Sequence, residues 1–223
     1  MLIKMIKHHG LKNGLRRFKE EIFENRLFDL RYGVETAGIL THNEYYNHVG
    51  QDKSAGAMWY QPTYASPLVK TFTFLKKREL PADKTILFID LGVGKGKPCI
   101  IAAKQLKDCR IVGVDLSSEL LSICESNLKA CGVSNFKLIQ QNVLEVDFNE
   151  LFDGFDTVIV HNKNSFDKAI TGKTLASIEG AKAGKTVYYI YNNPVYRELF
   201  EGKELLFQLN GWHKNHVLHL YRL

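Results

Sequence analysis

The sequence has 223 residues, of which 24% are charged and 45% hydrophobic, and its net charge is +6. This composition excludes collagen-like, disordered and disulfide-scaffold proteins, and it fits one globular domain, alone or with an attached segment. No apolar run approaches the roughly 20 residues that span a bilayer, and the first residues lack the pattern of a secretory signal.

The first 31 residues form a basic arm, with eight basic and four acidic side chains. Apolar residues recur in it at steps of three and four, from Leu11 to Leu30, which predicts a helix with one apolar face that packs elsewhere. The basic side chains favour a solvated helix face, and contact with nucleic acid or with an anionic membrane surface is the alternative. Residues 31–61 lose this periodicity, so we expect an irregular segment rich in loops.

A regular alternation follows. After a helix that begins near Pro62, short apolar runs alternate with longer amphipathic segments. Five of these runs read as strands that are each followed by a helix, and two further runs read as a closing antiparallel pair with a six-residue loop. The seven predicted strands are residues 85–90, 110–115, 136–140, 157–161, 186–191, 204–209 and 216–222.

The four cysteines fall inside apolar or helical patterns and show no CxxC spacing, so we expect reduced core thiols and a cytoplasmic protein. They are Cys99, Cys109, Cys124 and Cys131. The histidines do not combine with cysteines or acids at the spacing of metal ligands, and no metal site is predicted.

The most informative motif is Asp-Leu-Gly-Val-Gly-Lys-Gly at residues 90–96, where the first strand of the alternation meets its helix. In an open parallel sheet, ligands bind at the carboxyl ends of the strands, and glycines there let the backbone approach a ligand closely. The next strand ends in Asp115, whose carboxylate can accept hydrogen bonds from both hydroxyls of a ribose. Together these features predict a site for an adenosine-type ligand.

Spacing separates the possible adenosine ligands. The dinucleotide fingerprint G-x-G-x-x-G requires a glycine at position 97, which is Lys97. A phosphate-binding loop requires a glycine five residues before each Gly-Lys-Thr, and Asp167 and Glu179 stand there instead. Neither motif is therefore present.

The pattern D-x-G-x-G-x-G after one strand, an acid at the end of the next, and a final antiparallel pair resembles the class I S-adenosylmethionine-dependent methyltransferases. Residues 31–36 and 60–63 add a likeness to a group of small, uncharacterised methyltransferase domains. The resemblance implies an α/β fold with a doubly wound, seven-stranded, mostly parallel sheet and an antiparallel last strand, here with an N-terminal helical extension. We therefore divide the chain into an N-terminal helix and irregular segment (1–60) and a methyltransferase domain that binds S-adenosylmethionine (61–223).

The resemblance also implies the cofactor-binding residues. Asp90 is similar to the acid that orients the amino group of the cofactor, the three glycines line its amino-acid end, Asp115 holds the ribose and Asn142 bonds the adenine. Tyr60 and Thr63 lie in a segment that contacts cofactor in similar protein-lysine methyltransferases. The set is Tyr60, Thr63, Asp90, Gly92, Gly94, Gly96, Asp115 and Asn142.

The methyl acceptor is expected at the end of the fourth strand, where the sequence reads His161-Asn162-Lys163-Asn164-Ser165-Phe166. This run resembles the Asn-Pro-containing element of amino-group methyltransferases only loosely, because it has no proline. His161 is a candidate general base, with a strand-end histidine bonded to backbone as the alternative. Asn162 and Asn164 are candidates for orienting the acceptor, and Tyr191 is a candidate at the end of the fifth strand.

We therefore expect an S-adenosylmethionine-dependent methyltransferase that acts on a nitrogen or oxygen of a protein or small molecule. The alternative is a cofactor-binding scaffold without catalysis that docks on a partner through its basic arm. Nucleic acid ranks lower as an acceptor, because the sequence has no recognisable RNA-binding module and no CxxC zinc element.

Overall fold

A computed structural model describes residues 2–49, 56–80 and 84–223. Its centre is one seven-stranded sheet in the order β3-β2-β1-β4-β5-β7-β6. Strands β1 to β5 pair in parallel, while β7 runs antiparallel to both of its neighbours. The predicted α/β fold is confirmed. The strands are β1 (Ile86–Leu91), β2 (Arg110–Asp115), β3 (Phe136–Gln140), β4 (Thr157–Asn162), β5 (Thr186–Asn192), β6 (Glu204–Leu209) and β7 (Leu218–Arg222).

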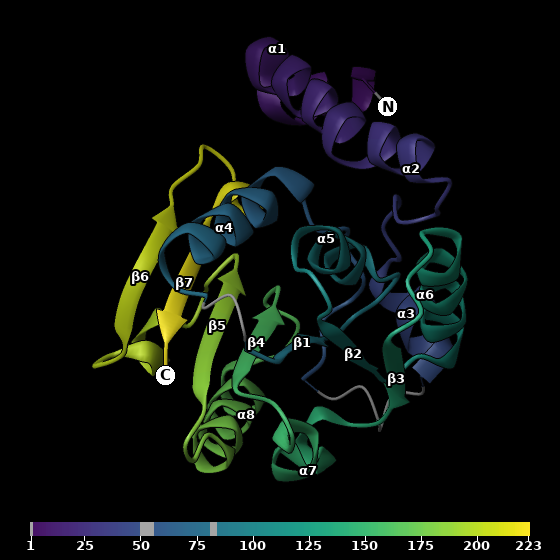
Figure 1. Cartoon of the computed structure of the whole chain (residues 1–223). Helices are drawn as coiled ribbons and strands as arrows, with labels where there is room; N and C mark the ends of the chain where they lie inside the picture. Colours follow the sequence, from purple (N-terminus) through teal and green to yellow (C-terminus); the bar gives the residue numbers. More distant parts are fainter. Residues whose placement is uncertain (1, 50–55, 81–83) are drawn as a thin grey trace.

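Helices cover both faces of the sheet (Figure 1). On one face, α4 (Ala65–Arg78), α5 (Lys97–Gln105) and α6 (Ser118–Ala130) pack over alternate strand residues such as Phe88 and Ile159. On the other face, α7 (Phe148–Phe152) and α8 (Lys168–Ala181) pack over the intervening residues. This two-sided burial explains why β1, β2, β4 and β5 read as nearly continuous apolar runs.

The chain reverses its direction along the sheet between β1 and β4. Strand β1 pairs with β2 on one side and with β4 on the other. The connections that leave β1 and β4 therefore run to opposite faces of the sheet, and the gap between them is where a ligand binds in folds of this kind. The register places Asp90 beside His161 at this point.

The basic arm forms α1 (Leu2–Glu21), a π-helical segment η1 (Ile22–Arg26) and α2 (Leu27–Tyr32). Gly10 interrupts α1 with non-helical backbone angles. The expectation that the apolar side of the arm packs elsewhere is wrong for much of that side. Phe28 is buried, whereas Leu11, Phe23 and Leu30 are exposed. None of the helices in the described part of the chain is long and apolar enough to cross a membrane.

The segment expected to be irregular contains a helix, α3 (His42–Val49). Thr41 starts it, because its hydroxyl accepts a hydrogen bond from the Glu44 amide while the Glu44 carboxylate accepts one from the Thr41 amide at 2.6 Å. This reciprocal capping box is readable as T-x-x-E in the sequence. The remaining short turns are 3-10 segments: η2 (Val143–Glu145), η3 (Arg197–Phe200) and η4 (Lys214–His216). Because η4 takes up residues 214–216, β7 starts two residues later than predicted.

All four cysteines are buried and unpaired, as predicted. Burial raises the pKa of the Cys99 thiol well above its ordinary value, which keeps it protonated and unreactive.

Candidate functional site

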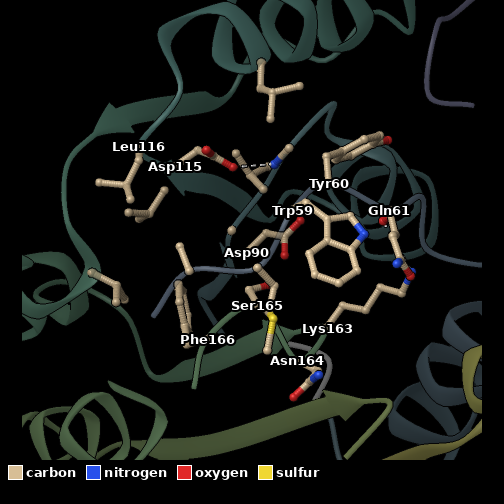
Figure 2. A pocket seen from close by; sticks show the side chains of 18 of the residues that line it. Trp59, Tyr60, Gln61, Asp90, Asp115, Leu116, Lys163, Asn164, Ser165 and Phe166 are labelled. Carbon is tan, nitrogen blue, oxygen red and sulfur yellow. Dashed lines mark hydrogen bonds between the residues drawn. The ribbon is translucent and has the colours of Figure 1, made fainter. Parts of the chain in front are cut away.

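A cavity of 250 Å³ opens at the carboxyl ends of β1, β2 and β4. Much of its wall comes from four parts of the chain: the glycine loop after β1, the end of β2, the loop after β4, and the segment 57–63 that precedes α4 (Figure 2). Nine of the twelve residues predicted for the site line it: Tyr60, Thr63, Asp90, Gly92, Gly94, Asp115, Asn142, His161 and Asn164.

The glycine loop packs closely against its neighbours. Gly92, Gly94 and Gly96 have φ angles of 77°, 52° and 83°, in the left-handed region that favours glycine. A Cβ atom on Gly94 would lie 2.5 Å from the Tyr60 ring, and one on Gly92 would lie 2.6 Å from Ser165 Oγ. Bare backbone therefore faces the cavity at both positions. Gly96 lies behind it, at the start of α5, where a Cβ atom would meet the Cys124 sulfur.

Asp115 ends β2 and holds the glycine loop. Its Oδ2 accepts a hydrogen bond from the Gly94 amide at 2.8 Å, the dashed line in Figure 2, and its Oδ1 accepts one from the Ser117 amide at 3.0 Å. A carboxylate oxygen can accept a second hydrogen bond, so capacity for a ligand remains. Burial raises the Asp115 pKa to about 6, although the two amides oppose this effect. The cap of α6 is Ser117, so Asp115 is not needed for that structural role.

Asn142 lies after β3 and also lines the cavity. Its side-chain carbonyl accepts a hydrogen bond from the Leu144 amide at 3.0 Å and caps η2. Asn142 was predicted to bond the adenine. Its side-chain carbonyl is shared with the turn, while no hydrogen bond of the side-chain amide is seen among the described residues.

Asp90 and His161 form a buried pair on adjacent strands. His161 Nδ1 lies 2.7 Å from Asp90 Oδ1, and both side chains are almost fully inaccessible to solvent. A proton on Nδ1 satisfies this contact, which assigns the lone pair to Nε2. Nε2 has no partner among the described residues, and His161 lines the cavity. Burial raises the Asp90 pKa, and the adjacent histidine partly offsets that rise.

The loop after β4 pairs with the segment before α4. Ala57 and Phe166 form an antiparallel bridge, and the Met58 amide donates to the Ser165 carbonyl at 2.9 Å. Lys163 adds two hydrogen bonds between the two segments, because its Nζ donates to the carbonyls of Pro62 at 2.7 Å and Gln61 at 3.3 Å. Figure 2 shows the side chain reaching toward Gln61, beside the Trp59 ring.

Lys163 lines the cavity and was not among the predicted site residues. Desolvation, together with the nearby cations Lys97 and Lys214, lowers its pKa to about 7. Its place in the sequence, two positions after the histidine at the end of a predicted strand, was the one feature that could have marked Lys163 as a site residue. Trp59 and Gln61 also line the cavity and were missed, because they lie in a segment without periodicity.

Three predicted residues lie outside the cavity lining. Asn162 is fully buried, and its Oδ1 accepts a hydrogen bond from the Ser165 amide at 2.9 Å, which shapes the loop. Tyr191 is buried against Phe200, with ring centroids 5.3 Å apart. Gly96 is the third. By contrast, Asn164 lines the cavity with a φ of 47°, and its Oδ1 has no partner among the described residues.

The basic arm reaches the cavity through Lys97. This buried side chain lines the cavity, and its Nζ donates to the Glu24 carbonyl at 2.9 Å and to Asn25 Oδ1 at 2.5 Å. Burial lowers the Lys97 pKa to about 8. The Tyr60 hydroxyl connects the cavity to the segment that follows the arm, because it donates to the Thr36 carbonyl at 2.6 Å. Residues on both sides of the boundary at residue 60 thus build one site, and the division there stays a prediction.

Residues 82–200 match the family described as a methyltransferase domain. Among curated proteins, an uncharacterised methyltransferase of Emericella nidulans is 39% identical over 67 residues, which cover 30% of this chain and 23% of that protein. A tRNA (guanine-N(7)-)-methyltransferase of Streptococcus pneumoniae is 32% identical over 96 residues, which cover 41% of this chain and 43% of that protein. Both matches thus span less than half of the relative.

Solved structures share the fold at low identity. An rRNA methylase from Streptococcus thermophilus superposes with a TM-score of 0.51 at 16% identity, covering 70% of this chain and 95% of that one. A structure of MtNAS in complex with S-adenosylmethionine superposes with a TM-score of 0.50 at 13% identity, covering 70% of this chain and 62% of that one.

Proposed function

The chain belongs to the methyltransferase-domain family, whose methyl donor is S-adenosylmethionine, and we propose that it methylates a nitrogen or oxygen of a small molecule or a protein. The Asp90–His161 pair carries the proposal, because both residues line the cavity with the glycine loop and Asp115, and His161 Nε2 is buried without a hydrogen-bond partner among the described residues.

The cavity fits the cofactor. Gly92 and Gly94 line the cavity with backbone alone, and Asp115 keeps acceptor capacity for the ribose hydroxyls. Asn142 supplies a polar side chain beside the expected adenine position. When bound, S-adenosylmethionine supplies a methyl group on a positively charged sulfur, which makes that carbon electrophilic.

The residues of the chain then position the acceptor and accept its proton. Asp90 holds His161 in the tautomer whose Nε2 is unprotonated, so Nε2 can take the proton of an incoming O–H or N–H group. Asn164 Oδ1 is a second open acceptor that can orient the same group. The paired segments 56–58 and 165–167 contribute Ala57, Met58, Ser165 and Phe166 to the cavity wall. Transfer from the sulfonium then depends mainly on alignment of the reacting groups.

The experiment supplies methyl-labelled S-adenosylmethionine together with three separate pools: deproteinised metabolites, total protein and total RNA. We expect label in the metabolite or protein pool. His161→Gln should slow the transfer by about 10²–10⁴-fold while S-adenosylhomocysteine still binds, which separates catalysis from cofactor binding. Label in the RNA pool alone would contradict the acceptor class. That outcome is the second candidate, because one relative is named as a tRNA methyltransferase.

A cofactor-binding scaffold is the remaining alternative. The loop after β4 lacks the proline-containing element, and Lys163 there bonds to backbone carbonyls. Binding of S-adenosylhomocysteine without label in any pool would favour this alternative. The four free, buried thiols support a cytoplasmic location, which stays a proposal.

A further inference from the structure

The arm formed by α1, η1 and α2 divides its charges between two sides. Its four acidic side chains contact protein groups, and three of them reach beyond the helical arm. Glu20 accepts a hydrogen bond from Trp212 Nε1 at 2.6 Å, Glu24 accepts one from the Ser66 amide at 2.9 Å, and Asp29 accepts one from the Ala37 amide at 2.7 Å. Glu21 bonds to Asn25, the residue that also holds the buried Lys97.

The outward side carries cations and large apolar side chains. Six basic residues of the arm are exposed: Lys7, Lys12, Arg16, Lys19, Arg26 and Arg31. Arg16 among them pairs with Glu20 and lies over the Trp212 ring. Six apolar residues are exposed among them, with accessible fractions of 71% for Ile3, 65% for Leu11, 39% for Leu15, 67% for Phe23, 41% for Leu27 and 79% for Leu30. Figure 1 places α1 and α2 at the margin of the molecule, away from the sheet. Apart from the Arg16–Glu20 pair, no ion pair between these cations and the four acids of the arm is seen in the described part of the chain.

We propose that this outward side of the arm binds the surface of an anionic lipid bilayer. From Leu11 to Leu30, exposed apolar side chains recur at steps of three, four and eight and are interspersed with lysine and arginine, which suits a helical segment that lies in the interface. The apolar groups enter the acyl boundary while the long basic side chains reach the headgroups. The arm lies on the membrane surface and does not cross it, in agreement with the lack of a spanning helix in the described residues.

Two other binding partners match the charges and apolar groups of this surface less well. Nucleic acid pairs with the cations but offers nothing to five exposed aliphatic side chains, and Phe23 is the one aromatic ring among the six. A second copy of the chain would cover the apolar groups but would bring like charges together across a symmetric interface. A bilayer that contains anionic lipid matches both features at once.

Vesicle flotation of the full chain tests the proposal without reference to methyl transfer. The probes are vesicles of phosphatidylcholine alone and of phosphatidylcholine mixed with phosphatidylglycerol. We expect flotation with the mixed vesicles at low salt and release at high salt. The double variant Phe23→Asp/Leu30→Asp should bind about tenfold more weakly or worse. The matched control is Val195→Asp, because Val195 is 52% exposed and lies outside the arm; this variant should bind like the wild type.

Several outcomes would overturn the proposal: no flotation, equal binding to both kinds of vesicle, or an equal effect of the control. A wild-type dimer that the double variant converts to a monomer would assign the surface to a second copy. Retention on RNA together with absence from vesicles would assign it to nucleic acid. Thermal unfolding of each variant verifies that the chain is folded before flotation is measured.

Discussion

Replacing Asp115 with asparagine should separate the stability of the fold from cofactor binding. The buried carboxylate has a pKa of about 6, against 3.8 for an exposed aspartate. Because the folded pKa is raised, the folded state retains a proton that the unfolded chain releases. The unfolding free energy of the wild type therefore falls as the pH rises from about 4 to about 6. Above pH 6, the ionised Asp115 lowers this free energy by its full amount of about 3 kcal/mol.

Asparagine has no proton to release, so the unfolding free energy of the variant does not fall with pH at this position. Its amide can accept only one of the two hydrogen bonds that come from Gly94 and Ser117, which costs about 1–3 kcal/mol at every pH. This constant cost cancels when the difference between variant and wild type is compared at two pH values. Relative to the wild type, the unfolding free energy of Asp115→Asn should therefore rise by about 2–3 kcal/mol from about pH 4 to about pH 7.

Urea unfolding followed by tryptophan fluorescence measures this difference at both pH values, and calorimetric titration measures the affinity for S-adenosylhomocysteine. We expect at least about tenfold weaker binding by the variant at neutral pH, because a carboxylate accepts hydrogen bonds more strongly than an amide. A stability difference that does not change with pH would refute the raised pKa. Unchanged affinity would refute the role of Asp115 in the site.

Three further predictions concern the same cavity. His161→Gln should lower kcat by about 10²–10⁴-fold with little change in S-adenosylhomocysteine affinity, and single-turnover rates across pH should lose the dependence on a base; an unchanged rate would remove His161 from the chemistry. Gly94→Ala should weaken S-adenosylhomocysteine binding in calorimetry, because its Cβ meets the Tyr60 ring, whereas Gly154→Ala has a similar positive φ and open space and should bind normally. The lowered pKa of Lys163 means that wild-type stability rises with pH from about 7 toward 10, since the unfolded chain binds the extra proton. Lys163→Met should lose this rise in urea unfolding, and the exposed-site control Lys173→Met should keep it.

The parts of the molecule with strong periodicity were predictable from the sequence. Strands β1, β2, β4 and β5 are buried on both faces, so each reads as a short apolar run, and the glycine motif marks the turn after β1. Asp115 was predictable for the same reason, because an acid that ends a buried strand has few structural explanations. These features depend on local sequence.

The remainder of the site depends on contacts between distant segments. The pairing of Ala57 with Phe166 joins two loops that have no periodicity, and the reach of Lys163 to the Pro62 carbonyl follows from that pairing. The Asp90–His161 contact depends on strand order and register, because β1 and β4 become neighbours only where the chain reverses its direction along the sheet. No spacing rule within one segment contains this information.

The arm shows a different limit of sequence reasoning. Its apolar residues follow a helical repeat, so the helix was predictable. The repeat gives no information on whether another part of the same chain covers the apolar face. The structure leaves Leu30 and Phe23 exposed, because the body contacts the arm through polar groups such as Glu20 and Glu24.

The central claim is that the cavity binds the methyl donor of this family, and thermal unfolding with separate additions of S-adenosylmethionine, S-adenosylhomocysteine and NAD tests it most directly. A ligand at 100 times its Kd stabilises the folded state by about 2.7 kcal/mol, which raises Tm by about 5–11 °C for a chain of this length. We expect this rise with S-adenosylmethionine and S-adenosylhomocysteine and no rise with NAD. No rise with either of the first two, or a rise with NAD instead, would contradict the account.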